Sequence, residues 1–325
     1  MPDRRTMLTH SVAAGLALAL GRRAQLGAAA EPAAATPGAG PLLTRAIPST
    51  GEKLPVIGLG SSASFSSAAG SRDTAGLKAV LGTMVAHGAK VFDTAPSYGA
   101  SEEVAGRIAQ ELAITQSIFW ATKVNVAYGG RADPAAARAQ IEQSFKRLGV
   151  LTIDLIQVHN LGDVATQLPI LKDLKQRGRI RYLGVTTTFP SQYRELLRIM
   201  RREPLDFIGI DYAVDDRSVE REILPLALQR RIGVLAYAPF GRTSLFRRVG
   251  PRPVPDWAVA ELDTRTWAQF FLKFIISHPA ITVVTPATSA ADHMLDDLAG
   301  GRGRLPDAAL RTRMAAFIDS LPGGR

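Results

Sequence analysis

Short apolar runs rich in β-branched residues alternate along this chain with longer stretches in which hydrophobic residues recur at helical spacing. Most of the runs are apolar at consecutive positions, which is typical of strands buried on both faces. Eight such runs are predicted as strands: residues 54–60, 89–94, 117–124, 153–159, 180–186, 205–212, 232–238 and 281–286.

The stretches between these runs are predicted as amphipathic helices. They cover residues 73–87, 101–112, 134–148, 164–177, 191–202, 219–230 and 264–277, followed by 290–298 and 306–321. Side-chain oxygens that can cap helix starts stand at Asp73, Ser101, Asp133, Asp163 and Asp263. Glycines that can end helices stand at Gly88, Gly149, Gly178 and Gly233.

The alternation of strand and helix predicts an α/β fold with a parallel sheet covered by helices. Eight consecutive units favour closure into a (β/α)8 TIM barrel over an open sheet. We therefore expect one barrel domain over residues 49–325, with an extra C-terminal helix at 306–321. In such a barrel the functional groups lie at the carboxyl ends of the strands and in the loops that follow them.

Composition adds limits to the chemistry. The 325 residues are 46% hydrophobic and 21% charged, which is ordinary for a globular domain. The formal charge of +10 raises nucleic acid as a partner, but the Lys and Arg residues are scattered along helical stretches, so we expect no nucleic-acid binding. The chain has no cysteine and its histidines are isolated, which argues against a thiolate nucleophile and a metal site.

The first thirty residues have the pattern of a targeting segment. Arg4 and Arg5 precede an apolar stretch at 12–20, which is shorter than the roughly 20 residues of a spanning helix. Three alanines at 28–30 offer a cleavage site. We expect a twin-arginine signal peptide over 1–30, an Ala- and Pro-rich tether over 31–48, and export to the periplasm by the twin-arginine machinery. An N-terminal anchor or an incorrectly assigned start remains an alternative.

Four titratable side chains stand at or just beyond the ends of three consecutive predicted strands. Asp93 and Tyr98 follow the second strand, Lys123 lies at the end of the third, and His159 at the end of the fourth. Each has an ordinary structural explanation when taken alone: a turn cap, a lysine reaching solvent, a satisfied core imidazole. Together they are expected on one rim of the barrel.

This set suits proton delivery to a carbonyl oxygen. A phenol with a pKa of about 10 is a poor acid at neutral pH, and an adjacent ammonium group lowers that pKa. We expect Lys123 to act on Tyr98 in this way, Asp93 to pair with Lys123, and His159 to bind the substrate oxygen. Because no metal site is expected, a hydride must come from an organic cofactor.

On these residues the chain resembles the aldo/keto reductase superfamily. The resemblance runs from about residue 54 to 298, and its most specific parts are the segment FDTAPSYG at 92–99, then Lys123 and His159. It implies reduction of an aldehyde or ketone by NADPH or NADH. It also implies that Tyr98 is the acid, that Lys123 and Asp93 tune it, and that His159 positions the small-molecule carbonyl substrate.

The resemblance is less even for the nicotinamide contacts. Tyr237 stands where the family stacks an aromatic ring on the nicotinamide. Thr186 and Thr187 replace a Ser-Asn pair, and Gly209 replaces a Gln, among the residues that bind the carboxamide.

The contacts to the adenosine depart further. Thr288 and His293 lie in the segment where members specific for a 2′-phosphate place Lys and Arg, and Asp296 and Asp297 align with the Glu-Asn pair that holds adenine. A carboxylate close to a phosphate is unfavourable. These departures keep a second hypothesis open, in which the exported barrel binds a nucleotide or small metabolite without turnover.

Overall fold

The described part of the chain comprises residues 40–62, 64–66, 74–127 and 129–323 of a computed structural model. These residues belong to one compact unit that begins at Thr36. The predicted signal peptide, residues 31–39 of the predicted tether and the predicted cap Asp73 lie outside the described residues.

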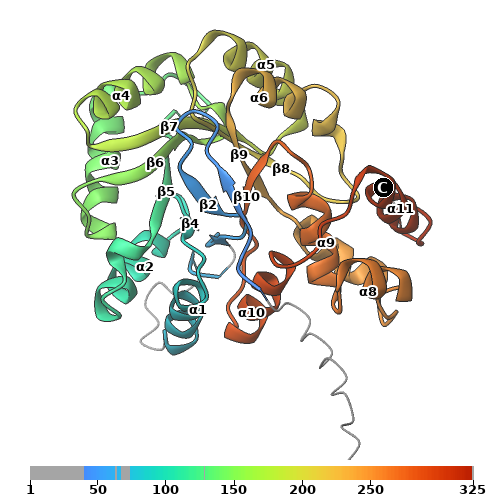
Figure 1. Cartoon of the computed structure of the whole chain (residues 1–325). Helices are drawn as coiled ribbons and strands as arrows, with labels where there is room; N and C mark the ends of the chain where they lie inside the picture. Colours follow the sequence, from blue (N-terminus) through green and yellow to red (C-terminus); the bar gives the residue numbers. More distant parts are fainter. Residues whose placement is uncertain (1–39, 63, 67–73, 128, 324–325) are drawn as a thin grey trace, which may run out of the picture. The chain divides into compact units, whose positions relative to one another are not determined.

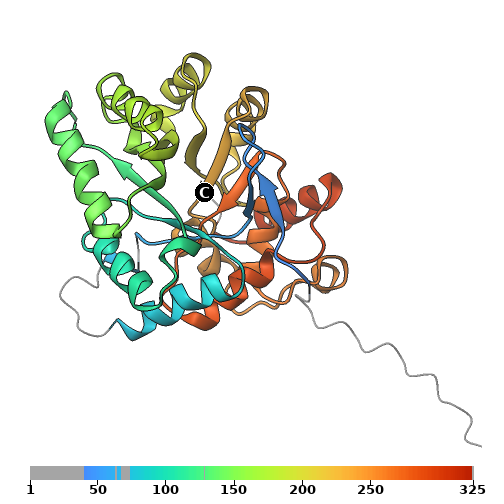
Figure 2. The ribbon, with the colours of Figure 1, turned by 60° about the vertical axis from the view of Figure 1, so that its left-hand side comes forward.

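Eight strands form one parallel sheet whose order follows the sequence from β3 to β10. The amide of Gly58 donates to the carbonyl of Val284 at 2.9 Å and that of Gly60 to Pro286 at 2.8 Å, which joins the first strand to the last. The predicted (β/α)8 barrel is confirmed, with helices around the strands in both views (Figure 1, Figure 2). The strands are β3 (Leu59–Gly60), β4 (Val91–Asp93), β5 (Phe119–Val124), β6 (Ile153–Val158), β7 (Ile180–Thr187), β8 (Phe207–Asp211), β9 (Gly233–Tyr237) and β10 (Ile281–Val284).

Helices follow the strands at nearly all the predicted places. They are α1 (Ala75–Ala86), α2 (Ser101–Glu111), α3 (Pro134–Leu148), α4 (Val164–Gln176), α5 (Tyr193–Arg202), α6 (Ile223–Arg230), α9 (Trp267–Ile276), α10 (Ala291–Gly300) and the extra C-terminal helix α11 (Ala308–Asp319). Two short helices, α7 (Ser244–Val249) and α8 (Asp256–Leu262), lie between β9 and α9, where no helix was predicted.

The two ends of α3 follow the predicted cap chemistry. The Asp133 carboxylate accepts two backbone N–H groups of the first helical turn at 3.0 and 3.2 Å, and Gly149 ends the helix in the left-handed conformation with φ of 68°. Ser101 and Asp163 lie at helix starts as predicted but make no side-chain cap hydrogen bond.

Two predicted helix ends are wrong. Helix α9 is capped by the Thr266 hydroxyl, while Asp263 ends the preceding helix α8 with φ of 54°. Helix α6 ends at Arg231, which takes the left-handed conformation with φ of 55°, so Gly233 is free to begin β9. In both cases a polar residue adopts a conformation that the prediction reserved for glycine.

An antiparallel hairpin of β1 (Thr44–Ala46) and β2 (Lys53–Pro55) precedes the barrel. It corrects two predictions, because residues 44–46 were assigned to the tether and residues 54–60 to a single strand. Arg45 donates to three carbonyl groups at the end of α9 and the start of β10, at 2.6 to 3.0 Å. The hairpin therefore covers the amino ends of the barrel strands, opposite the rim on which the site was predicted.

Side chains inside the barrel change from apolar to polar along the strands. The apolar interior consists of Val91, Phe119, Ala121, Leu155, Tyr182, Phe207, Leu235 and Val283, with Ile47 and Leu54 from the hairpin segment. The strand period of two brings the residues two positions beyond these into the same interior. That set includes Asp93, Lys123, Gln157, Gly209 and Tyr237, which form a polar layer at the carboxyl end.

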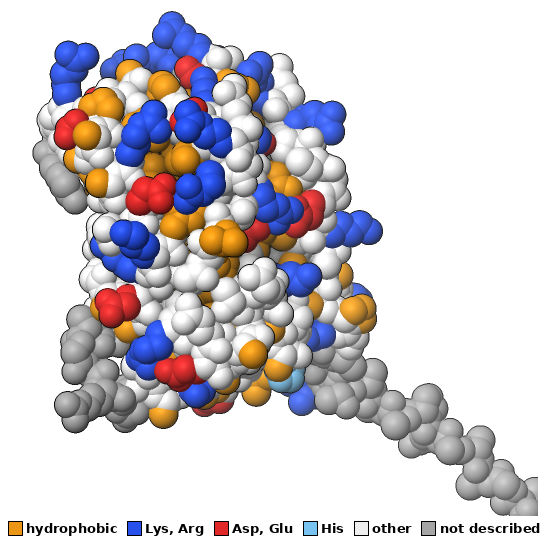
Figure 3. Space-filling view, turned by 90° about the vertical axis from the view of Figure 1, so that its left-hand side faces the viewer, with side chains coloured by type: hydrophobic (Ala, Val, Ile, Leu, Met, Phe, Trp, Pro, Cys, Tyr) orange, Lys and Arg blue, Asp and Glu red, His pale blue; other side chains and the backbone are white. Residues whose placement is uncertain are grey.

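Basic side chains are dispersed over the surface. On the face in Figure 3, Lys and Arg lie among acidic and hydrophobic side chains rather than in one patch. Many are paired, for example Arg138 with Asp173 at 3.2 Å and Arg179 with Glu142 at 3.3 Å. Within the described residues, no helix combines the length and apolar character needed to cross a membrane.

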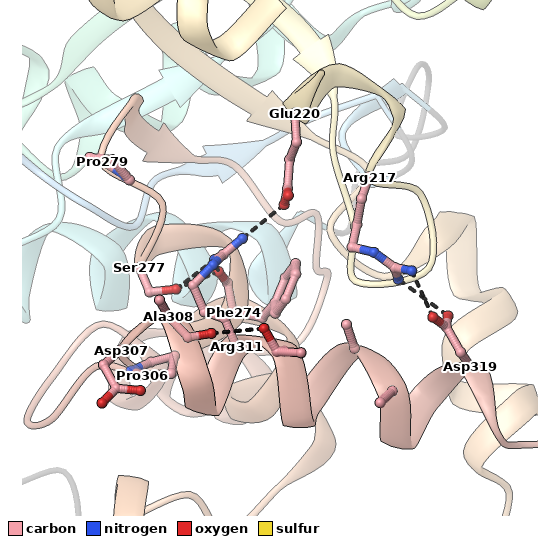
Figure 4. Close-up of a pocket in the computed structure, with 13 residues that line it drawn as sticks. Arg217, Glu220, Phe274, Ser277, Pro279, Pro306, Asp307, Ala308, Arg311 and Asp319 are labelled. Atoms are coloured by element: carbon pink, nitrogen blue, oxygen red, sulfur yellow. Dashed lines mark hydrogen bonds and ion pairs between the residues drawn. The ribbon is translucent and has the colours of Figure 1, made fainter. Parts of the chain in front are cut away.

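A cavity of about 610 Å³ lies beside α11 on the outside of the barrel (Figure 4). None of the predicted catalytic residues lines it. Four of its charged side chains form two ion pairs: Arg217 pairs with Asp319 at 2.7 Å, and Arg311 pairs with Glu220 at 2.8 Å. We therefore assign this cavity to the attachment of α11 rather than to chemistry.

Arg311→Ala is expected to destabilise the fold. The guanidinium donates to Tyr212, Glu220 and Ser277 at 2.7 to 2.8 Å, and its loss leaves the Glu220 carboxylate without its cation. The pair is partly buried, with the Arg311 and Glu220 side chains 15% and 32% exposed, so its loss should lower the free energy of unfolding by about 1.5 to 3 kcal/mol, as for a hydrogen bond to a charged group. Urea denaturation measures the difference. The matched control is Arg313→Ala on the same helix, whose exposed pair with Glu261 should contribute about 1 kcal/mol or less.

Candidate active site

The loop after β4 carries the predicted acid. Asp93 is the last residue of β4, and the turn that follows is closed by hydrogen bonds from the Tyr98 amide to Ala95 and from the Ser101 amide to Tyr98, both at 3.0 Å. Gly99 has φ of 55°, and a Cβ there would lie 2.7 Å from the carbonyl oxygen of Ser66. The turn that presents Tyr98 therefore requires glycine at position 99.

Asp93 and Lys123 form a buried ion pair beneath this turn. The Lys123 Nζ atom lies 2.7 Å from Asp93 Oδ2 and donates to the carbonyl of Thr94 at 2.8 Å. Both side chains are at most 5% exposed. Burial raises the pKa of Asp93, and Lys123 opposes that shift. Burial would lower the pKa of Lys123, but Asp93 and Tyr98 outweigh it, so the ammonium group stays charged.

Tyr98 lies over this ammonium group, with the centre of its ring 5.1 Å from Lys123 Nζ. The sequence predicts that Lys123 brings the pKa of Tyr98 below its usual value. Lys123 acts in that direction, but burial is the larger effect and leaves the pKa of Tyr98 raised. The phenol is therefore protonated at neutral pH and is in the form that can donate a proton.

His159 lies beside Tyr98, as the sequence predicted. The two rings meet edge to face with their centres 5.7 Å apart, and His159 Nδ1 is 3.5 Å from the Ser97 hydroxyl. Burial, with a smaller contribution from Lys123, lowers the pKa of His159 to about 3. The imidazole is neutral at physiological pH, so it can offer one N–H to a neighbouring oxygen without carrying charge.

A cavity of about 310 Å³ opens above these groups. It is lined by Gly60, Ser61, Ser62, Asp93, Tyr98, Thr188, Asp211, Tyr237, Ala238, Pro239, Phe240, Arg242, Thr243, Thr285 and Ala287. The Thr285 hydroxyl is buried and has no hydrogen-bond partner among the described residues. A cavity at the carboxyl end of the barrel, with a proton donor in its wall and an unsatisfied hydroxyl, is a candidate active site.

Comparison with known proteins identifies the family of this chain. The profile described as "Aldo/keto reductase family" matches residues 56–310. The chain belongs to the aldo/keto reductase family. A soybean (Glycine max) protein named "Probable aldo-keto reductase 1" is 33% identical over 169 residues, which is 48% of this chain and 47% of that protein. The chain thus spans about half the length of this curated relative.

Solved structures of aldo/keto reductases share the fold. One from Bacillus halodurans, in its holo form, superposes with a TM-score of 0.68 at 21% identity and covers 85% of this chain and 96% of that one. One from Klebsiella pneumoniae, solved with NADPH, gives 0.69 at 23% identity over 82% and 92%. The glycerol dehydrogenase of Gluconobacter oxydans gives 0.69 at 23% identity over 85% and 95%.

In this member of the family, the two threonines predicted to bind the carboxamide form hydrogen bonds within the protein. Thr186 Oγ1 accepts the backbone N–H of Asn160 at 3.1 Å, in a loop where Asn160 and Leu161 both have φ of 52°. The Thr187 hydroxyl donates to the side chain of Gln192. Thr186 thus supports the strained loop that follows His159.

Gly209 and Tyr237 occupy neighbouring strands of the polar layer. A Cβ built on Gly209 would lie 2.4 Å from the Tyr237 hydroxyl oxygen. The Tyr237 ring therefore fills the space in which the family's Gln was expected.

The residues predicted to hold the adenosine lie on or just before α10. Thr288 bonds to the backbone of Ala290 and His293 is exposed. Asp296 accepts from Thr266 and Gln269 at the start of α9, at 2.7 to 3.0 Å. Asp297 is buried, and burial followed by the charge of Asp296 raises its pKa well above the usual value. A raised pKa reduces the negative charge that Asp297 would bring near a phosphate.

Two residues of this site, Gln157 and Asp211, were missed from the sequence. Gln157 is fully buried, and its side chain lies 3.1 Å from the Tyr237 hydroxyl. Asp211 and Arg242 form an ion pair at 2.7 Å in the cavity wall. The period of two that places Leu155 inside the barrel would have placed Gln157 there as well. No sequence signal pairs Asp211 with Arg242, because the loop after β9 brings them together.

Proposed function

We propose that this protein is an NAD(P)H-dependent oxidoreductase that reduces an aldehyde or ketone to an alcohol, with Tyr98 as the general acid. The observation that carries the proposal is the cluster at the mouth of the barrel. A protonated phenol lies over the ammonium group of a buried Lys123–Asp93 pair, with a neutral imidazole at its edge.

Each group has a defined part in this reaction. Tyr98 donates its proton to the carbonyl oxygen, and Lys123 stabilises the phenolate that remains. Asp93 keeps Lys123 charged and in place. His159 offers a neutral N–H that orients the substrate oxygen before the proton moves. The bound nicotinamide supplies the hydride.

The cavity contains groups that fit a nicotinamide nucleotide. The Tyr237 ring lies in its wall, and the Thr285 hydroxyl there has no partner among the described residues. Arg242 and Thr243 have φ of 53° and 75°, and their amides can form an anion-binding concavity. We propose that Tyr237 and Thr285 contact the nicotinamide end and that the 241–243 segment holds the pyrophosphate. The structure of the Klebsiella pneumoniae aldo-keto reductase, solved with NADPH, supports this choice of cofactor.

The test is to mix the purified protein with NADPH or NADH and a panel of aldehydes and ketones. We expect oxidation of the reduced nicotinamide, followed by its absorbance, that depends on both the carbonyl and the enzyme. Binding of either nucleotide without turnover of any carbonyl would support the alternative of a non-catalytic binding barrel. The hydrogen bonds of Thr186 to the Asn160 backbone and of Thr187 to the Gln192 side chain are the observation that favours this alternative.

The preference for NADPH over NADH is expected to be weak. The segment 285–297 contains no Lys or Arg, and charge-assisted hydrogen bonds to a 2′-phosphate contribute about 1.5 to 3 kcal/mol each. We expect dissociation constants that differ by about tenfold or less, which corresponds to about 1.4 kcal/mol. Fluorescence titration of the cofactor-free protein with both nucleotides measures the ratio.

A preference of about a hundredfold, or two such decades, would show that a phosphate-binding cation has been missed. Arg242 is then the first residue to test, because it lines the cavity. Arg248 is the matched control, since its side chain donates to carbonyl groups at the end of α11.

We also propose that residues 1–30 direct export to the periplasm through the twin-arginine machinery. The proposal rests on Arg4 and Arg5 before the apolar stretch at 12–20. Because this route carries folded proteins, the nucleotide is expected to be loaded before export. Changing Arg4 and Arg5 to Lys should leave the unprocessed precursor inside the cell, as seen by fractionation. Processing and export of that variant would contradict the proposal.

A further inference from the structure

We propose that Tyr237 is a positioning residue of the acid site: its hydroxyl holds Asp93, and through Asp93 and Lys123 it sets the acidity of Tyr98. This inference rests on the proposed function, in which Tyr98 delivers the proton. It adds a role for the hydroxyl to the stacking role that the family resemblance implies for the ring.

The two oxygens of Asp93 are held by two different donors. Lys123 Nζ lies 2.7 Å from Oδ2, and the Tyr237 hydroxyl lies 3.3 Å from Oδ1. The same hydroxyl is 3.1 Å from Gln157 Oε1. A hydroxyl has one proton to donate, and an ionised carboxylate is the stronger acceptor. The bond to Asp93 is therefore the contact through which Tyr237 can influence charge in the site.

Gly209 makes this position of the ring possible. A Cβ at residue 209 would lie 2.4 Å from the Tyr237 hydroxyl oxygen and 2.5 and 2.6 Å from two ring carbons. Contacts this short require the Tyr237 ring to move away from β8, toward the cavity that it lines. Position 209 must be glycine for the hydroxyl to reach Asp93, so the two residues form one unit.

The ammonium group of Lys123 lies between two phenol rings. Its Nζ atom is 5.1 Å from the ring centre of Tyr98 and 5.3 Å from that of Tyr237. Burial, and after it the charges of Asp93 and Tyr98, raise the pKa of Tyr237 well above its usual value. Of the two phenols, Tyr237 thus remains the permanent donor while Tyr98 exchanges its proton.

The other charged or titratable groups around the pair come from separate elements. Asp211, at the end of β8, raises the pKa of Tyr237, and Arg242, from the loop after β9, lowers that of Tyr98. His159, from the end of β6, is neutral because its pKa is about 3. Asp211 and Arg242 are paired with each other, so their effects on the site largely cancel.

Removing the hydroxyl has a predictable sign. Without the hydrogen bond from Tyr237, the carboxylate of Asp93 is less stabilised. It therefore interacts more strongly with the ammonium group of Lys123. Less of the positive charge of Lys123 then favours the phenolate of Tyr98, so the pKa of Tyr98 rises. Reduction requires protonated Tyr98 and is lost as the pH passes above that pKa. The basic limb of the rate profile should therefore move to higher pH, while the weaker acid lowers the rate on the plateau.

The experiment compares wild type, Tyr237→Phe and Tyr182→Phe. Tyr182 is the matched control: its hydroxyl also donates to a carboxylate, that of Glu52, but at the opposite end of the barrel. For Tyr237→Phe we expect the turnover number to fall about tenfold, as for the loss of one hydrogen bond to a charged group. The basic limb should rise by about one pH unit. The phenylalanine ring remains, so the affinity for NADPH, measured by fluorescence, should change less than about threefold.

Gly209→Ala supplies a second route to the same state, because its Cβ displaces the hydroxyl. It should move the basic limb in the same direction. If Tyr237→Phe leaves the limb in place, or if Tyr182→Phe moves it equally, the inference is wrong even where the rate falls. Ultraviolet titration measures the pKa of Tyr98 without turnover, from the difference between proteins with Tyr98 and their Tyr98→Phe counterparts. An inactive wild type would therefore contradict the proposed function and still leave the coupling decided by this titration.

Discussion

Tyr98→Phe is expected to lower the rate of carbonyl reduction by about 10² to 10⁴, the usual contribution of a general acid. The phenylalanine ring fits the same place, since Tyr98 is held by a turn whose hydrogen bonds use only the backbone. The Lys123–Asp93 pair beneath it is unchanged. The loss therefore arises from the missing proton and not from an altered fold.

The measurement is the turnover number with saturating cofactor and a carbonyl substrate, together with the affinity for NADPH and the urea midpoint. Affinity and stability should stay close to those of the wild type. Activity within about threefold of the wild type would remove Tyr98 from the mechanism, because it falls far short of the range for a general acid.

Lys123→Met should damage both activity and stability. The substitution leaves the Asp93 carboxylate, of which 5% is exposed, without its cation. Removing one partner of a buried ion pair lowers the free energy of unfolding by about 3 to 5 kcal/mol. The rate should fall by about 10² or more, because the phenolate of Tyr98 loses the charge that stabilises it.

The double variant Lys123→Met with Asp93→Asn separates the two effects. It removes both charges, so most of the lost stability should return while the rate stays low. Urea denaturation and steady-state kinetics on the two variants make the comparison. Equal destabilisation in both variants would show that packing, rather than the unpaired carboxylate, explains the loss.

Much of the barrel could be predicted from the sequence because its strands and helices have different periods. Runs buried on both faces marked the strands, and the strand ends placed Asp93 and Lys123 at the same rim of the barrel. The first predicted strand, residues 54–60, divides between the hairpin and the barrel. Apolar composition does not distinguish an antiparallel partner from a parallel one, so this division was not predictable from pattern alone.

The positions of the proposed catalytic residues follow more directly from the sequence than those of the proposed cofactor contacts. Asp93, Lys123 and His159 are fixed by strand ends, whose position follows from local pattern. The use of Thr186 depends on a strained loop around Asn160, and the role of Gly209 depends on the ring of Tyr237 from the next strand. Such contacts join segments that are distant in sequence. The direction in which the pKa of Tyr98 shifts could also be determined only from the structure, because burial and the Lys123 charge act in opposite directions.

The central claim is that Tyr98 protonates a carbonyl while a bound nicotinamide supplies the hydride. A single-turnover reaction with NADPH deuterated at the transferred position tests it most directly, in the wild type and in Tyr98→Phe. The account predicts that deuterium appears on the carbinol carbon of the product in the wild type, at a rate that Tyr98→Phe lowers by about 10² or more. Reduction without deuterium transfer, or equal transfer rates in the two proteins, would contradict the account.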